Sequence, residues 1–426
     1  MTGPGVRVTQ RDSRVPPDSG LTTWRRSVPA VLLVALMVGT AAYAKAPLTV
    51  AVVGPFSGFE SFIGPNTLAG VQVAVDLINA DGGVLDREVR VATGDTSGDA
   101  LEVVPALQKA VRVDHASGVI GPTSVTLQAA LPYIASLDIV AVLSGGTTFV
   151  DRNPLPNLFR TTPSDTLMGV AMAYYAYTEG HRRAALVFGT NASAQTLTSP
   201  VADTFAALGG KVVARVGLSP GQASYRSEVL KIYSAHPDVI FFQLDPTTGG
   251  TYFDEVSQLE GPFVPYVGTD VTASADFIRA VGVKTASSMI VSIQGRSVGG
   301  AGANAFAAAY RRVIGGDPLV LANYGYDAMN VLALAWTKAR ATHGDLVFQA
   351  MHEVAAPPGT PCNTYASCKA LLLAGKDINY EGASGSVDFN RYGNVASEFE
   401  AVKAGPHGEP QVVSTIDAKA IAPFVK

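Results

Sequence analysis

The sequence predicts an α/β fold of two lobes, each built around an open parallel sheet that is covered by helices on both faces. From residue 48 onward, short apolar runs of strand length alternate with segments that carry apolar residues at helical spacing. These runs are too many for one continuous sheet of ordinary size, which favours two sheets. The chain has 426 residues, 47% of them hydrophobic, so it is long enough for two or three domains.

The first sheet is predicted from the alternation that begins this region. Leu48–Gly54 is apolar apart from Thr49, as expected for a buried strand. Apolar residues three and four apart predict a helix over 67–80, which ends at a Gly-Gly pair. Further elements are expected as strands over 88–92, 119–120 and 139–143, with a helix over 100–113.

The second sheet is predicted to begin after an extended polar stretch, Phe159–Pro163, where the pattern restarts with a helix over 165–179. Its strands are expected over 184–188, 212–216 and 239–242. A strand over 289–293 is predicted to cross back and return a long helix, 324–340, to the first lobe. The lobes are therefore assigned as residues 45–161 plus 295–394, and residues 162–294 plus 395–426.

A cleft is expected where the carboxyl ends of the strands meet, because open parallel sheets bind ligands at this edge. The segment Gly118–Ala130 lies there, with an apolar strand that runs into Gly-Pro and a helix that begins among Thr123, Ser124 and Thr126. The start of a helix has unpaired N–H groups and favours an anion. The sequence has no Gly-x-x-x-x-Gly-Lys-Ser/Thr loop, so a nucleotide phosphate is not indicated.

The amino terminus has the pattern of a secretory signal, with cleavage after Ala44. An Arg-Arg pair is followed by the apolar run Val28–Val38 and then by Ala-Tyr-Ala. The alternative is a membrane anchor, but the run is short for about 30 Å of hydrocarbon. Cleavage would remove five Arg and two Asp from a chain of net charge −4, leaving −7. Such a charge argues against nucleic acid or an anionic membrane as a partner, and a periplasmic protein is expected.

Cys362 and Cys368 are the only cysteines. Close spacing in an exported chain suggests a local disulfide, with two unlinked thiols as the alternative. No metal site is indicated, since the six histidines show neither an i, i+4 pair nor a carboxylate at metal-ligand spacing. A Gly-x-Ser-x-Gly elbow is also absent. The sequence therefore predicts neither an enzyme nor a cofactor.

The mature region resembles the type I periplasmic solute-binding proteins of ABC importers, most of all the leucine/isoleucine/valine-binding proteins. The resemblance rests on short motifs in order along the chain: Gly54-Pro-Phe-Ser-Gly58, Asp76–Gly83, Gly121-Pro-x-Ser124, Leu143–Thr148, Phe159-Arg-Thr161, Val267–Asp270, Tyr324–Ala328 and Gly382–Asn390. It implies two Rossmann-like lobes joined by a multi-strand hinge. It also implies an exported monomer that closes around a small ligand, in the manner of a Venus flytrap, and delivers it to an inner-membrane ABC permease.

The resemblance assigns the ligand carboxylate to Ser124 and Thr148, with backbone N–H groups beside them, and gives a carbonyl near Gly146 a bond from the ligand ammonium. It assigns the pairing of that ammonium to Asp270. Each residue also has an ordinary structural role open to it. Ser124 and Asp270 fit helix caps, and Thr148 fits a turn.

The wall of the cleft is predicted less sharply. Phe62 and Ile63 are expected to form apolar wall, with ordinary turn packing as the alternative. The resemblance leads one to expect a Tyr after the strand that contains Leu186–Phe188, but Ser193 stands at about that place. The wall of the second lobe should therefore be smaller or more polar than in a leucine binder. Tyr324 and Tyr326 are interpreted as core or lobe-packing residues.

The predicted function is an exported receptor that binds an amino acid or a close relative. One alternative is a sensory or regulatory module of the same fold, which binds an amide or an aromatic carboxylate. The other is an exported α/β enzyme. Location in the cell separates the first from the receptor, and activity that depends on a cleft serine would identify the second.

Overall fold

The computed structural model describes residues 45–58, 60–259, 263–295 and 300–425. The predicted signal peptide, residues 1–44, lies outside the described residues. Within the described ranges the strands form two large sheets and one small sheet, with helices between successive strands. The α/β class and the two-lobe arrangement predicted from the sequence are confirmed.

The first large sheet is parallel throughout and has the strand order β2-β1-β3-β4-β5. Its strands are β1 (Leu48–Gly54), β2 (Val89–Asp95), β3 (Ala116–Ile120), β4 (Val140–Leu143) and β5 (Leu158–Arg160). Strand β5 is only three residues long, and the sequence predicts no separate strand there.

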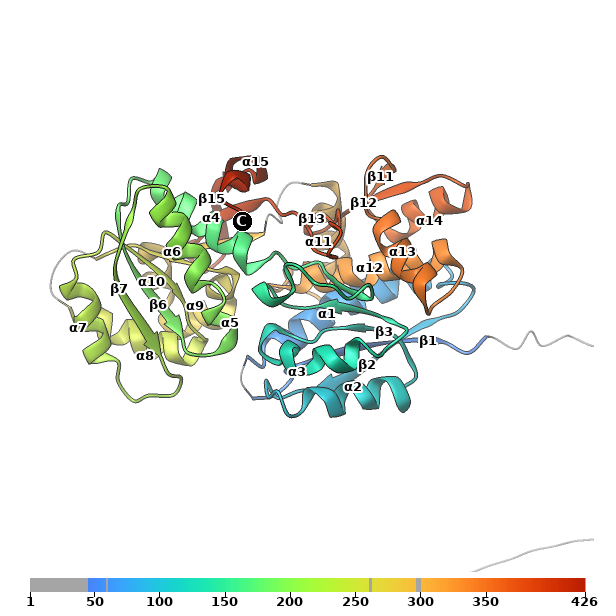
Figure 1. Cartoon of the computed structure of the whole chain (residues 1–426), viewed down its shortest axis with the longest axis horizontal. Helices are drawn as coiled ribbons and strands as arrows, with labels where there is room; N and C mark the ends of the chain where they lie inside the picture. Colours follow the sequence, from blue (N-terminus) through green and yellow to red (C-terminus); the bar gives the residue numbers. More distant parts are fainter. Residues whose placement is uncertain (1–44, 59, 260–262, 296–299, 426) are drawn as a thin grey trace, which may run out of the picture. The chain divides into compact units, whose positions relative to one another are not determined.

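Helices cover both faces of the first sheet, as Figure 1 shows. Helices α1 (Ile63–Ala80) and α12 (Ala322–Ala339) pack on one face, and α2 (Val103–Arg112) and α3 (Ser124–Ile134) pack on the other. The four residues Val50–Val53 of β1 alternate between these two apolar clusters. Burial on both faces explains why β1 is almost entirely apolar.

The second large sheet has the strand order β15-β14-β10-β9-β8-β6-β7, parallel from β7 to β10 and antiparallel beyond. Its strands are β6 (Arg183–Gly189), β7 (Lys211–Leu218), β8 (Val239–Gln243), β9 (Tyr266–Gly268), β10 (Ile290–Gly295), β14 (Phe399–Ala404) and β15 (Pro410–Ile416).

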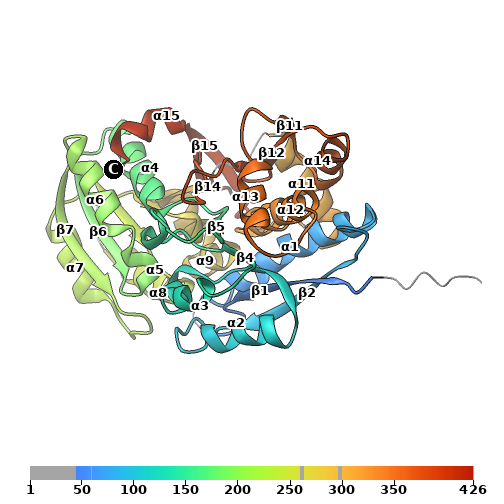
Figure 2. The same ribbon diagram turned by 45° about the vertical axis from the view of Figure 1, so that its right-hand side comes forward.

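Two layers of helices also enclose the second sheet. Helices α4 (Asp165–Thr178) and α6 (Thr198–Ala207) share one apolar cluster with it, and α7 (Arg226–Ser234), α8 (Pro246–Ser257) and α9 (Ala275–Val281) share the other. Figure 2 shows the short C-terminal helix α15 (Ala418–Ile421) beside α4. The remaining short helices of this lobe are α5 (Ala192–Gln195) and α10 (Val283–Met289).

A small third sheet, β11-β12-β13, lies in the stretch that follows α12. Its strands are β11 (Thr360–Cys362), β12 (Ile378–Gly382) and β13 (Gly385–Ser386), and the helices of the region are α11 (Ala301–Val313), α13 (Asp345–Glu353) and α14 (Tyr365–Leu373). A disulfide joins Cys362 at the end of β11 to Cys368 in α14, with a Cα–Cα distance of 5.3 Å.

The buried carboxylate of Asp327 ties the third sheet to α12. It accepts hydrogen bonds from the backbone N–H groups of Ala383 and Ser384, and from the hydroxyls of Ser384 and Tyr380. Burial raises the pKa of Asp327, and these four donors partly offset the effect. The Tyr-Gly-Tyr-Asp and Gly-Ala-Ser-Gly motifs therefore have a structural role, since they join two distant segments of the chain.

The chain passes from one lobe to the other after β5, after β10 and before β14. The strand predicted over 289–293 corresponds to β10, and the helix that returns to the first lobe is α12, which packs on α1. These crossings place the carboxyl ends of strands from both sheets around one cavity.

Candidate functional site

The cavity has an empty volume of about 650 Å³ and is lined by residues of both lobes. The first lobe supplies the segments that follow β1, β3 and β4. The second supplies the start of α4 and residues at the ends of β6, β8 and β9. Each of these segments lies at the carboxyl end of its strand or directly follows it, which is where open α/β sheets bind ligands.

Ser124 forms part of the cavity wall as the first residue of α3, with only 9% of its surface exposed. Its Oγ accepts a hydrogen bond from the backbone N–H of Thr147 at 3.2 Å, which leaves the hydroxyl proton available to donate. The N-cap position belongs to Thr123, whose side chain makes no capping bond. The alternative that Ser124 is merely a helix cap is therefore wrong.

Thr123 also lines the cavity and is 2% exposed. Its Oγ1 is buried and has no hydrogen-bond partner among the described residues. A buried hydroxyl without a partner costs free energy, so a ligand atom that bonds it is favoured. The two hydroxyls lie beside the N–H groups at the start of α3, and together they form a donor-rich subsite suited to an anion.

Two glycines let the loop after β4 come close to charged and polar atoms of the cavity. A Cβ atom on Gly145 would collide with the Ser124 hydroxyl, and one on Gly146 would collide with the carboxylate of Asp165. Any side chain at either position would displace a polar group of the cavity. This explains why the loop carries two consecutive glycines.

Three carboxylates, those of Glu60, Asp165 and Asp270, face the cavity; we call them the cavity carboxylates. Burial raises the pKa of Glu60 to about 7, and the charges of Asp245 and Asp165 act in the same direction. Burial likewise raises the pKa of Asp165 to about 7 and that of Asp270 to about 6. The charged forms of all three are therefore disfavoured in the empty cavity, and a cation would stabilise them.

Only neutral groups bond the cavity carboxylates. Asp165 accepts from the Thr196 hydroxyl, and Asp270 accepts from the backbone N–H of Val271. A hydrogen bond from Ser193 to Glu60 partly offsets the rise in its pKa. None of the three forms an ion pair with a described residue.

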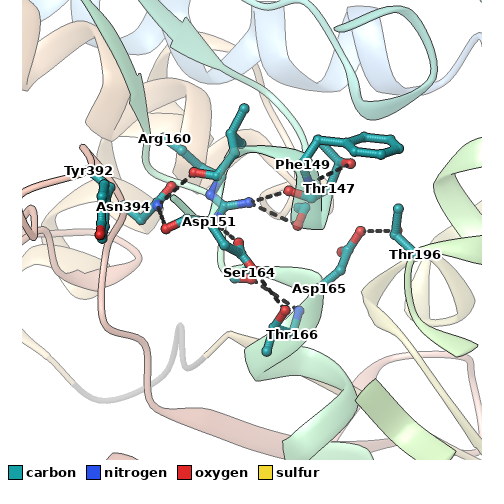
Figure 3. A network of polar contacts seen from close by, with 12 residues as sticks. Thr147, Phe149, Asp151, Arg160, Ser164, Asp165, Thr166, Thr196, Tyr392 and Asn394 are labelled. Atoms are coloured by element: carbon teal, nitrogen blue, oxygen red, sulfur yellow. Dashed lines mark hydrogen bonds and ion pairs between the residues drawn. The ribbon is translucent and has the colours of Figure 1, made fainter. Parts of the chain in front are cut away.

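The two terminal nitrogens of the nearby Arg160 guanidinium bond groups other than the cavity carboxylates, as Figure 3 shows. It donates to the carbonyls of Gly146 and Thr147, both at 2.9 Å, and pairs with Asp151 at 2.7 Å. Arg160 is 1% exposed. Its charge lowers the pKa of Asp165, but burial raises that pKa by more. Arg160 therefore holds the loop after β4 in position and does not neutralise the cavity.

The wall of the second lobe is polar. Gln243, at the end of β8, donates to Ser193 at 3.5 Å and accepts from Thr269 at 2.9 Å. All three residues line the cavity. These side chains leave room and hydrogen-bonding capacity where an aromatic ring would close the space.

The structure brings most of the predicted site residues to the cavity wall: Ile63, Thr123, Ser124, Gly146, Ser193 and Asp270. Phe62 is not among the lining residues. Thr148 is not either, because the chain enters a 3-10 turn at this point. The turn directs Thr148 to a separate surface cavity, and Thr147 takes the position beside Ser124. The assignment of Thr148 to the ligand carboxylate is therefore corrected.

Sequence reasoning missed Glu60, Asp165 and Gln243. The sequence marks Asp165 only as the start of a helix, and Glu60 lies in an irregular turn with a φ of 58°. Tyr324, interpreted from the sequence as a core or packing residue, lines the cavity, whereas Tyr326 lies in the apolar core. The sequence signal that could have indicated Glu60 and Asp165 is the number of acidic residues near the predicted strand ends.

No three His, Cys, Asp or Glu side chains converge closely enough to hold a metal ion in the part of the chain that the structure describes. The cavity carboxylates are therefore too dispersed for a common metal. None of the helices in that same part is long and apolar enough to span a membrane.

Residues 47–366 match the family model described as periplasmic binding protein. The chain is 26% identical to an amino acid binding protein of Pseudomonas aeruginosa over 51% of its own length and 59% of that protein's. It is also 26% identical to the Leu/Ile/Val-binding protein BraC3 of Rhizobium johnstonii, over 61% of this chain and 71% of that protein. These matches thus leave a substantial part of each relative uncovered.

Solved structures share the fold at lower identity. A leucine binding protein, LivK, from Thermotoga maritima has a TM-score of 0.75 and 20% identity, covering 87% of this chain and 99% of its own. A solute binding protein of an ABC transporter from R. palustris, solved with benzoate, has a TM-score of 0.71 and 17% identity, covering 87% and 96%.

Proposed function

Because the chain belongs to the periplasmic binding protein family, we propose that it is an exported receptor that captures an amino acid between its lobes. In this proposal the receptor acts as a monomer in the periplasm and delivers the ligand to an inner-membrane ABC permease. It performs no chemical step on the ligand.

The observation that carries the proposal is the division of polar groups between the walls of one cavity. The first lobe presents hydrogen-bond donors, the Thr123 and Ser124 hydroxyls beside the start of α3. The second lobe presents the carboxylate of Asp270. A zwitterionic amino acid needs donors for its carboxylate and an acceptor for its ammonium, and these two walls provide both.

Contacts from both walls of the cavity favour binding of a zwitterion for two physical reasons. Hydroxyl and N–H donors bind a carboxylate without adding a second buried charge, which keeps the desolvation cost modest. A ligand held by both lobes binds the closed arrangement more tightly than the open one, and so shifts the hinge equilibrium. A micromolar dissociation constant corresponds to a favourable binding free energy of only about 8 kcal/mol.

The relatives named for amino acids and the structure solved with benzoate point to two different ligand chemistries. An aromatic carboxylate has no ammonium, so it would leave Asp270 without a cationic partner. The polar, acidic second wall therefore favours an amino acid. The regulatory module considered from the sequence is tested by cell fractionation, since such a module would remain in the cytoplasm.

Calorimetry on the protein produced from the full chain and purified from the periplasm tests the proposal. The panel comprises α-amino acids with neutral and charged side chains, an aliphatic amide and benzoate. We expect at least one α-amino acid to bind. The analogue of that amino acid without its amino group should not bind. Binding of benzoate or the amide, with no response to any amino acid, would contradict the proposal.

A further inference from the structure

The cavity presents more acidic side chains than the single ammonium of a simple amino acid can pair with. Glu60, Asp165 and Asp270 all line it, and its lining contains no Lys, Arg or His among the described residues. The ammonium of a neutral amino acid needs one acidic partner. Two carboxylates remain after Asp270 has been assigned to that ammonium.

These two carboxylates, Glu60 and Asp165, reach the cavity from different elements. Glu60 comes from the turn before α1, and Asp165 is the first residue of α4. The two charges disfavour each other, since Asp165 contributes to the raised pKa of Glu60. Neither has an ion-pair partner in the described part of the chain, and the side chains that bond them there, Thr196 and Ser193, offer neutral hydroxyl groups.

A metal ion does not fit this arrangement. Hard cations such as Ca²⁺ need several oxygen ligands at about 2.3–2.6 Å, and no three carboxylates among the described residues converge to such a point. Negative groups that are dispersed around a cavity suit a ligand with more than one positive centre along its length.

A second, independent feature of the cavity requires the ligand to carry an anion as well. The Thr123 hydroxyl is buried, lacks a partner among the described residues and lies beside Ser124 at the start of α3. A diamine without a carboxylate would leave this subsite empty. The ligand that satisfies both features has one carboxylate and two cationic groups.

We infer that the ligand is a cationic α-amino acid, of the lysine, ornithine or arginine class, whose side-chain cation lies between Glu60 and Asp165. The inference rests on the proposed function, because it places the α-carboxylate on α3 and the α-ammonium on Asp270. It explains why the second-lobe wall is acidic and polar around Ser193 and Gln243.

Three matched probes test the inference by calorimetry at pH 8, where the cavity carboxylates are charged. Lysine has both features, norleucine lacks only the side-chain ammonium, and 1,5-diaminopentane lacks only the carboxylate. We expect lysine to bind at least tenfold more tightly than norleucine, and we expect the diamine to bind weakly. Ornithine and arginine are included to test the length and shape of the side chain.

Glu60→Gln and Asp165→Asn should each reduce the preference for the cationic amino acids at least fivefold. Glu102→Gln, at an exposed position on the same lobe as Glu60, should leave it unchanged.

The outcomes separate the inference from the proposed function. Norleucine binding as tightly as lysine would overturn the inference while the receptor for amino acids stands. The diamine binding as tightly as lysine, or the absence of binding by every α-amino acid, would overturn the proposed function as well. A preference for lysine that survives both substitutions would overturn the placement of its side chain.

Discussion

Replacing Asp270 by Asn removes the negative charge that we assign to the ligand ammonium while keeping the shape of the side chain. The carboxylate lines the cavity and accepts a hydrogen bond from the backbone N–H of Val271, at 2.9 Å. An amide oxygen can still accept that bond, so the local backbone should hold.

The expected loss of affinity follows from leaving an ammonium enclosed without its partner. Truncating one member of a buried, hydrogen-bonded charge pair costs about 2–5 kcal/mol. This corresponds to a dissociation constant roughly 30-fold to several thousand-fold higher, since each 1.4 kcal/mol is a factor of about ten.

The stability of the empty protein should change in the opposite direction. Burial raises the pKa of Asp270 to about 6, so the folded state holds a proton more tightly than the unfolded state does. Stability is then lost as the pH rises from the ordinary value of 3.8 through about 6. At pH 7 the Asp270→Asn variant should unfold at or above the parent's denaturant midpoint.

Calorimetry with the best amino acid ligand, together with urea unfolding of the empty protein, checks both expectations. Asp254→Asn, an exposed position in α8, is the matched control. An Asp270→Asn variant that binds the ligand with unchanged affinity would refute the assignment of the ammonium. Equal losses for an amino acid and for its deaminated analogue would refute it too.

Ser124→Ala should weaken a carboxylate ligand by about 1–3 kcal/mol, because a charge-assisted bond is lost; unchanged affinity in calorimetry would show that the hydroxyl does not contact the ligand. Affinity for a cationic ligand should fall as the pH is lowered from 8 to 5, because the pKa values of Glu60, Asp165 and Asp270 are raised to about 7, 7 and 6 and these carboxylates become protonated in this range. An affinity that does not change with pH would argue against charge pairing. Arg160→Met should destabilise the fold by about 1–3 kcal/mol in urea titrations, because the buried carbonyls of Gly146 and Thr147 and the partly exposed Asp151 lose their charged donor, and a midpoint equal to the parent's would contradict the role given to this residue.

Much of the fold follows from the sequence because its strands are buried on both faces. Leu48–Gly54 has the same bounds as predicted, and the strands predicted over 184–188 and 239–242 lie within β6 and β8. Two kinds of strand were missed for other reasons. Strand β5 is very short, and the β14–β15 hairpin has an exposed outer strand whose polar residues give no continuous apolar run.

The candidate site was predictable where position along a strand determines it. Ser124 and Asp270 closely follow strands that end at the cavity, and the family resemblance selected them. Glu60 and Asp165 become neighbours only through the packing of the two lobes around the cavity, which no local pattern encodes. Thr148 lies away from the cavity because a 3-10 turn begins there, and the backbone N–H of Thr147 is the group that contacts Ser124.

A crystal structure of the protein with its ligand bound tests the central claim most directly. We predict the α-carboxylate within hydrogen-bonding distance of Ser124 and the start of α3, and the α-ammonium on Asp270 of the opposite lobe. A ligand that contacts only one lobe, or that lies outside the cavity, would contradict the account.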